Sequence, residues 1–268
     1  MPVSALALAL GSAVLHAVWN LLLGRARDVQ AATAATFVLS FAIAVPFAVI
    51  WWHAEPSVWP YALASSVLEI VYVIALALAY RQGEVSFVYP VTRGLAPVLA
   101  LGFAILWLGH RISAAEVAGV LLVGAGVVLV RGVAGGDRLA LVLTATLAVT
   151  IAAYTLVDRV GIGRAGALTY FVLTLAGPCL VYPPLVGMRA MRREVGGAVL
   201  VAALANLGSF TLGLLALRHA GAAVVLAVRS ASVVLTTALA GRVLAERVSR
   251  GRLAGSVLVL VGIAVLAR

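Results

Sequence analysis

The chain has 268 residues, of which 64% are hydrophobic and 10% are charged. Soluble domains have roughly 45–50% apolar and about 25% charged residues, so this composition excludes an ordinary soluble fold and favours a chain that lies in a lipid bilayer. The net charge of +10 would suggest nucleic acid in a soluble protein, but the arginines fall between apolar stretches, where orientation and anionic headgroups account for them. We expect no nucleic-acid partner.

Short charged clusters divide the sequence into ten apolar stretches, and a spanning helix needs about 20 such residues. The stretches are 3–24, 32–52, 58–80, 85–108, 114–131, 138–158, 165–187, 195–217, 222–244 and 251–267. They lack the sustained alternation that a barrel requires. We predict an all-α polytopic membrane protein with ten transmembrane helices. The opening ALALALGSA is expected to stay as the first helix, because no basic segment precedes it as in a signal peptide.

The two halves of the chain repeat one pattern of residues. A shift of 136 positions superimposes Arg93 on Arg229, Arg111 on Arg247, Ser113 on Ser249, Gly119 on Gly255 and Gly126 on Gly262. A shift of 137 places Glu69 on Asn206. Because five spans is an odd number, the second copy enters the membrane from the opposite side, as in the inverted repeats of transporters. We expect one transmembrane domain with repeats at 1–132 and 133–268, and glycine pairs that allow close helix contact.

Four ionisable side chains lie deep within predicted spans: His16, Glu69, Arg93 and Arg229. An ionisable group at the bilayer centre costs about 2.5–3.5 kcal/mol on insertion scales, so it normally faces the bundle interior and marks a pathway or a partner. Two interpretations of Glu69 and Arg93 stay open. They form a structural salt bridge between neighbouring helices, or they belong to a binding site.

Helical spacing predicts which polar residues share a face with these groups. Three and four residue separations pair Tyr89 with Arg93, Asn20 with His16, and Tyr72 with Glu69. Trp19 adjoins this face and is expected to form a cavity wall, whereas Asn206 is as suited to a helix contact as to substrate. The candidate substrate-binding residues are therefore Arg93, Arg229, Tyr89, Glu69, Tyr72, His16, Trp19, Asn20 and Asn206.

Two prolines, Pro90 and Pro97, bracket Arg93 in the fourth span. Each removes a backbone donor and frees a carbonyl that only a cavity or a protein neighbour can satisfy. We predict hinges at both prolines and expect this span to be the moving or broken helix. Tyr154 and Asp158 in the sixth span are weaker site candidates, because Asp158 next to Arg159 is expected to end that helix at the surface.

Four segments carry a resemblance to a known family. They are HAVWNLLLGR (16–25), AYRQGEVSFVYPVTRGLAP (79–97), LGHRISAAEVAGVLLVGAGVVLV (108–130) and its repeat LAERVSRGRLAGSVLVLVGIAVL (244–266). The chain resembles, over essentially its whole length, the EamA-like family of the drug/metabolite transporter superfamily. The resemblance implies ten helices in two inverted five-helix repeats, a central cavity, and export or exchange of small metabolites.

The intramembrane charges guide the expected substrate. Arg93 and Arg229 against Glu69 leave one positive charge, which favours a carboxylate or a phosphate, with Arg93 as anchor and Arg229 as its counterpart. We expect a secondary transporter of a carboxylate-bearing, amino acid-like metabolite in the bacterial plasma (inner) membrane, an exporter or exchanger using alternating access. Glu69, supported by His16, is the proton-coupling candidate. The alternative is a proton-coupled multidrug exporter of cationic or aromatic compounds.

Other functional classes find little support in the sequence. No HExxH motif, paired catalytic aspartates, Cys/His ligand spacing or nucleotide-binding P-loop occurs, so we expect no enzyme activity, no metal and no cofactor. The expected partners are a small-molecule substrate, the lipid bilayer and protons as candidate coupling ions, in a monomer or homodimer. Loops after odd-numbered spans hold eleven arginines against five on the other side. This count predicts external termini, whereas the resemblance implies internal ones.

Overall fold

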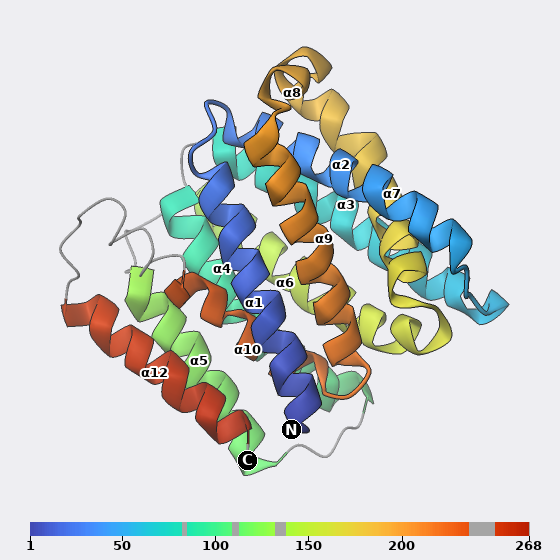
Figure 1. The fold of residues 1–268 in the computed structure, drawn as a ribbon. Helices are drawn as coiled ribbons and strands as arrows, with labels where there is room; N and C mark the ends of the chain where they lie inside the picture. The colour runs from blue at the N-terminus through green and yellow to red at the C-terminus, as the bar shows by residue number, and fades with distance from the viewer. Residues whose placement is uncertain (82–84, 109–112, 132–137, 236–249, 268) are drawn as a thin grey trace.

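The computed structural model describes residues 1–81, 85–108, 113–131, 138–235 and 250–267, and the regular structure of these residues is helical apart from one isolated bridge. The helices follow one another through the chain (Figure 1) as α1 (Val3–Leu23), α2 (Val29–Ile50), η1 (Pro56–Val58), α3 (Trp59–Arg81), α4 (Val85–Leu108), α5 (Ala114–Arg131), α6 (Arg138–Gly161), η2 (Ile162–Arg164), α7 (Ala167–Val186), α8 (Met188–Glu194), α9 (Gly197–Leu217), α10 (Ala222–Arg229) and α12 (Arg250–Leu266).

The long helices are of membrane-spanning length and composition. Among the described residues, 6 helices are long and apolar enough to cross a bilayer, at Val3–Leu23, Val29–Ile50, Pro56–Ala79, Leu141–Arg164, Ala167–Val186 and Gly197–Leu217. Shorter apolar helices lie at Val91–Leu106, Ala114–Leu129, Ala222–Leu235 and Ala254–Leu266. The all-helical membrane fold is confirmed, since every one of these helices falls on a predicted stretch.

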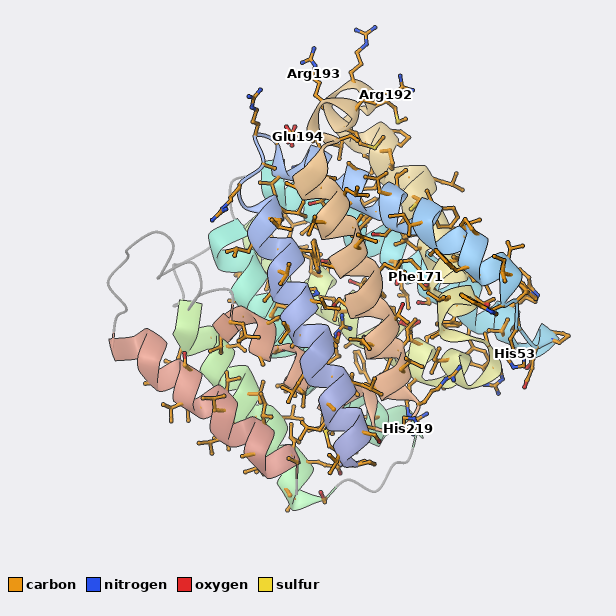
Figure 2. All side chains as sticks on the ribbon, viewed as in Figure 1. His53, Phe171, Arg192, Arg193, Glu194 and His219 are labelled. Carbon is orange, nitrogen blue, oxygen red and sulfur yellow. The ribbon has the colours of Figure 1, made fainter. Side chains whose placement is uncertain are left out.

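Three features depart from the predicted spans. The fourth span is not broken, because α4 runs unbroken through both Pro90 and Pro97. The ninth span is the interrupted one: α10 ends at Arg229, Ser230 forms a turn, and the chain resumes as helix at 231–235. The seven-residue helix α8, which the sequence did not predict, carries Arg192 and Arg193 at the end of the molecule away from both termini (Figure 2).

Large apolar side chains cover the outside of the bundle, whereas small ones fill much of its interior. Leu106, Leu180 and Ile50 are 70–77% exposed, and many alanines and several serines of the helices are fully buried. Water would penalise this exposed surface, whereas lipid does not. The distribution therefore fits a protein whose outer surface contacts acyl chains and whose helices approach closely through small residues.

Close helix contacts occur at the predicted glycines. A Cβ atom added to Gly126 of α5 would lie 2.7 Å from the Gly255 carbonyl oxygen of α12, and one added to Gly119 would lie 3.0 Å from the Gly262 carbonyl oxygen. These distances are too short for any side chain, so glycine is what permits the α5–α12 contact. The two helices lie side by side in Figure 1.

One end of the bundle is tied together around the α6–α7 connection. The Arg218 guanidinium, at the end of α9, donates through Nε to the Ile162 carbonyl at 3.2 Å and through Nη2 to the Ala165 carbonyl at 2.5 Å. The backbone of Ala54 forms an isolated bridge with Ala165, which joins the α2–α3 connection to the same turn. Three connections thus converge at the end where α1 begins.

Candidate functional site

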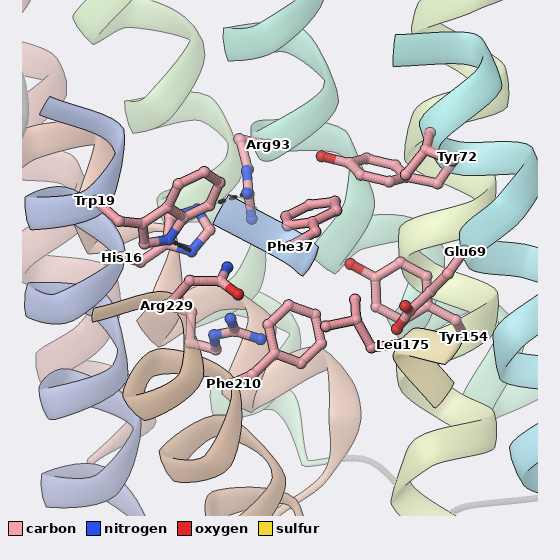
Figure 3. A pocket seen from close by; sticks show the side chains of 12 residues that line it. His16, Trp19, Phe37, Glu69, Tyr72, Arg93, Tyr154, Leu175, Phe210 and Arg229 are labelled. Carbon is pink, nitrogen blue, oxygen red and sulfur yellow. Dashed lines mark hydrogen bonds between the residues drawn. The ribbon is translucent and has the colours of Figure 1, made fainter. Parts of the chain in front are cut away.

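A buried cavity lies where eight helices meet near the middle of the bundle (Figure 3). Its lining consists of His16, Trp19, Phe37, Glu69, Tyr72, Val73, Arg93, Tyr154, Leu175, Asn206, Phe210 and Arg229. These residues come from α1, α2, α3, α4, α6, α7, α9 and α10. The cavity volume is about 30 Å³, far below the roughly 300–1,000 Å³ of ligand pockets.

The structure brings most of the predicted site residues into this one cavity. Seven of the nine candidates line it: His16, Trp19, Glu69, Tyr72, Arg93, Asn206 and Arg229. Asn20 does not, because its side-chain amide donates to the carbonyl oxygen of His16 at 2.7 Å, one turn earlier in the same helix. The side chains of Tyr89 and of the predicted hinge Pro90 lie outside the described part of the structure.

Arg93 and His16 form a short polar contact in the lining. The Arg93 Nη2 atom lies 2.7 Å from His16 Nε2, and the Trp19 indole nitrogen lies 3.2 Å from His16 Nδ1. Arginine and tryptophan can only donate, whereas a neutral imidazole has one acceptor nitrogen and one N–H. His16 can therefore accept from only one of the two neighbours, and a doubly protonated ring could accept from neither. In either tautomer, one of the two contacts of His16 therefore brings two N–H groups together.

A second arginine, Arg229, reaches the same cavity from the last residue of α10. Its guanidinium carbon lies 5.7 Å from the centre of the Phe210 ring, and its Nε atom is buried without a hydrogen-bond partner among the described residues. Gly213 of α9 leaves the space that this side chain needs, since a Cβ atom there would lie 3.1 Å from Nη1. Arg229 thus adds a second positive charge whose hydrogen-bonding capacity is not used up.

The amide of Asn206 adds further unused capacity. Its side chain is 1% exposed, and neither its nitrogen nor its oxygen has a partner within the described structure. A buried amide without partners costs on the order of 1–3 kcal/mol, so such groups normally mark a bound molecule or water. Nearby, the hydroxyls of Ser12 and Ser209 each donate to the other's carbonyl, which holds α1 against α9.

Glu69 lies across the cavity from the arginines, beside Tyr154 (Figure 3). The carboxyl group is 4% exposed, and its Oε1 atom has no hydrogen-bond partner among the described residues. Glu69 Oε1 therefore forms no salt bridge with Arg93 among the described residues. The Arg93 guanidinium contacts His16. Tyr72 and Tyr154 meet edge to face at 6.3 Å and frame the acidic side.

The apolar part of the cavity lining was not predicted from the sequence. Phe37, Val73, Leu175 and Phe210 were not predicted, and Tyr154 was only a weak candidate. Trp19 and Phe37 pack at 6.5 Å, and Phe171 and Phe210 at 5.7 Å, so aromatic rings fix the shape of the cavity. In a chain with 64% hydrophobic residues, nothing in the sequence pattern distinguishes these rings from those that face lipid.

Asp158 is a correction to the sequence interpretation. It was expected to end a helix at the surface, but α6 continues to Gly161 and the Asp158 side chain is 3% exposed. Its Oδ1 atom accepts hydrogen bonds from the Ser65 hydroxyl at 2.6 Å and from the Tyr170 hydroxyl at 3.0 Å. It is a buried acid bonded to two neighbouring helices.

Similarity to known proteins points the same way as the sequence motifs. Residues 3–132 match the EamA-like transporter family, which confirms the predicted resemblance and indicates a membrane transporter of the drug/metabolite type. A crystal structure of a protein with 21% sequence identity matches it with a TM-score of 0.71, covering 99% of this chain and 96% of that chain. At that identity the likeness shows the fold alone. No curated protein matches the sequence.

Proposed function

Because residues 3–132 match the EamA-like transporters, we propose that the chain is a secondary transporter of a small carboxylate-bearing metabolite, an exporter or exchanger that uses alternating access. The observation that carries this proposal is the surplus of donors on one side of the cavity. In either tautomer of His16, one of its contacts with Arg93 and Trp19 brings two N–H groups together, and Arg229 Nε has no partner among the described residues.

An anion resolves this surplus. If a carboxylate oxygen enters between Arg93 and His16, the arginine donates to it, and His16 can carry its proton on Nε2 and donate as well. Nδ1 then stays free to accept from the Trp19 indole. The contact between two donors is then removed, and the fork of an arginine suits a carboxylate in particular. The second guanidinium, Arg229, adds charge stabilisation in the same cavity.

The acidic side suggests the rest of the substrate. Glu69 Oε1 is buried without a partner in the described structure, and it faces the arginines across the cavity. A substrate with a carboxylate at one end and an ammonium group at the other would satisfy both sides and leave no buried charge uncompensated. This arrangement supports an amino acid-like zwitterion, with its side chain among the rings of Phe37, Tyr72 and Phe210.

The helix contacts support two inverted repeats, at 1–132 and 133–268. In the two repeats, helices α1 to α5 correspond in order to α6, α7, α9, α10 and α12. When each helix is replaced by its counterpart, the α1–α9 contact becomes α6–α3, the α1–α10 contact becomes α6–α4, and the α2–α9 contact becomes α7–α3. All of these contacts occur. The contacts α2–α7, α4–α10 and α5–α12 convert into themselves. The crossed glycine pairs Gly119–Gly262 and Gly126–Gly255 obey the same exchange. Such symmetry suits alternating access around a central site in the bacterial inner membrane.

Proton coupling is proposed at Glu69. A buried carboxylate oxygen without a donor is costly, so a proton or a cation at Glu69 Oε1 would be favourable. An ammonium group and a proton would then compete for the same oxygen. If Glu69→Gln leaves pH-driven uptake into proteoliposomes unchanged, coupling at this residue is wrong. His16 could take part only after Arg93 moves away, because both of its nitrogens face donors in this conformation.

A multidrug exporter of cationic or aromatic compounds is the second candidate. It is favoured by the unpartnered Glu69 oxygen and by the aromatic lining, which together suit an organic cation. The two arginines oppose it, since a cation would have to enter beside them.

Ligands that share one carbon skeleton separate the candidates. L-Valine has both charges, isovalerate only the carboxylate, and isobutylamine only the ammonium group. A ligand at 100 times its Kd stabilises the folded protein by about 2.7 kcal/mol, so thermal shift detects it. We expect L-valine and isovalerate to stabilise the purified protein, and labelled L-valine to exchange in proteoliposomes. Stabilisation by isobutylamine or tetraphenylphosphonium alone would instead support the cation exporter.

A further inference from the structure

Asp158 and its partners form a second polar cluster, outside the cavity lining. Asp158 lies on α6, with Ser65 of α3 donating to Oδ1 at 2.6 Å and Tyr170 of α7 donating to the same atom at 3.0 Å. Ser65 is fully buried, and Asp158 is 3% exposed. Ionisable groups this deep in a membrane helix are rare and usually functional.

We propose that Asp158 is a second proton-binding carboxylate, which exchanges a proton between Glu69 at the cavity and the aqueous face at the α6–α7 turn. This inference rests on the proton coupling of the proposed function and adds its route. The proton leaves one carboxyl oxygen as the other is protonated, and water at the α6–α7 turn accepts the proton from Asp158 or supplies it, so no other reactant is needed.

Helical geometry places the cluster between the cavity and the surface. Ser65 precedes Glu69 by four residues on α3, and Asp158 follows Tyr154 by four residues on α6. Four residues correspond to about 6 Å along a helix axis, so the two acids lie about one turn apart. Beyond Asp158, α6 ends at Gly161 and the turn η2 follows. The cluster thus lies one turn from the cavity and one turn from the end of the helix.

The two acids differ in how their oxygens are satisfied. Asp158 Oδ1 has two hydroxyl donors, which stabilise a negative charge, whereas Glu69 Oε1 has none among the described residues. Glu69 is also within electrostatic reach of Asp158. Two carboxylates so placed in a medium of low dielectric constant favour a single shared negative charge. One proton on Glu69 and one charge on Asp158 is the arrangement that the hydrogen bonds support.

Charged and titratable side chains on the neighbouring elements surround these two carboxyl groups. Those that face this part of α6 are Glu69 of α3, Tyr170 of α7, Arg229 of α10, Arg164 of η2, Arg218 of α9 and, on α6 itself, Tyr154. Arg164 and Arg218 donate to backbone carbonyls at the end of α6 and in the turn that follows. Arg229 is the cation within electrostatic reach of Asp158 in the interior. A substrate carboxylate that engages Arg229 would weaken its hold on the Asp158 charge and favour proton uptake there.

Infrared difference spectroscopy of the reconstituted protein tests this inference with protons alone. We expect two protonated-carboxyl bands that shift in D₂O and titrate with pH. Asp158→Asn should remove one band while keeping an oxygen that can accept from Ser65 and Tyr170, and Glu69→Gln should remove the other and move the midpoint of the first. As matched controls, Ser65→Ala and Tyr170→Phe remove a donor but keep the Asp158 band.

Two results would overturn the proposal. One is an infrared titration that Asp158→Asn leaves unchanged. The other is an Asp158 band whose midpoint does not move in Glu69→Gln, and this second result holds even if Asp158→Asn fails to fold. Substrate binding is measured separately by thermal shift. A protein that titrates as expected but binds none of the valine-related ligands would contradict the proposed substrate and leave the proton route intact.

Discussion

Replacement of Arg93 by lysine is the sharpest test of the anion site. Lysine keeps the positive charge but loses the planar fork of donors. In the native protein one Nη atom of Arg93 faces His16 at 2.7 Å, so the side chain already reaches the place where a carboxylate would enter. A lysine ammonium group offers a single point of contact there, and one of the two charged hydrogen bonds to the carboxylate is lost.

The expected loss follows from the energy of that one bond. A hydrogen bond to a charged group contributes about 1.5–3 kcal/mol. Because about 1.4 kcal/mol corresponds to a tenfold change in affinity, Arg93→Lys should weaken binding of isovalerate or L-valine by about 10- to 100-fold. Arg229→Lys should weaken it less, because Arg229 is held over the Phe210 ring at 5.7 Å and acts mainly through its charge.

Thermal-shift titration of both variants measures these affinities, and the unfolding temperature without ligand reports on the fold. Normal binding and transport by Arg93→Lys would refute the anchor. So would an Arg93→Ala protein that unfolds in detergent while Arg93→Ala/Glu69→Ala regains both folding and transport. In that case the arginine is a structural partner of Glu69, and the anchor lies elsewhere.

Two further predictions concern packing and orientation. Gly126→Ala should destabilise the protein by about 1–3 kcal/mol through overpacking, because its Cβ would lie 2.7 Å from a backbone oxygen. In the control Gly102→Ala, the added Cβ meets nothing within 4 Å, so this variant should not be destabilised. Thermal unfolding compares the two variants. Reporter fusions at the C-terminus and within α8 should place α8 in the cytoplasm and the termini outside, as the arginine count predicts, and a cytoplasmic C-terminus would show that the count misleads.

The polar part of the site could be predicted because the membrane penalises polar side chains at every other place. His16, Glu69, Arg93, Asn206 and Arg229 stand out in apolar stretches, and the cost of exposing them to lipid directs them inward. All five line one cavity. Their gathering is therefore a consequence of solvation energy, which the sequence alone carries.

The remaining features could not be predicted, for separate physical reasons. Phe37 and Leu175 line the cavity, but apolar residues face both lipid and interior in such a protein, so hydrophobic periodicity gives no inward face. Asp158 was misread because a charge beside Arg159 resembles a helix end. The turn at Ser230 could not be predicted because no proline or glycine lies at that position.

The contact between Ser230 and α4 gives a last prediction. Pro97 has no N–H, so the Arg93 carbonyl four residues earlier lacks its helical donor. The Ser230 hydroxyl shares its one proton between this carbonyl, at 3.1 Å, and the Leu226 carbonyl one turn earlier in its own helix, at 3.0 Å. The bond joins α4 to the interrupted span beside both arginines. Ser230→Ala should remove this bond and destabilise the protein by about 0.5–1.5 kcal/mol, the typical net contribution of one hydrogen bond.

The matched control is two residues away. The Ser232 hydroxyl is buried and has no partner within the described structure, so Ser232→Ala removes an unsatisfied group and should be neutral or stabilising. Thermal unfolding of the two variants compares the same chemical change at two positions. Equal stabilities would show that the Ser230 bond contributes nothing. A destabilised Ser230→Ala that still binds isovalerate normally would show that the bond holds the helices together without positioning the Arg93 side chain.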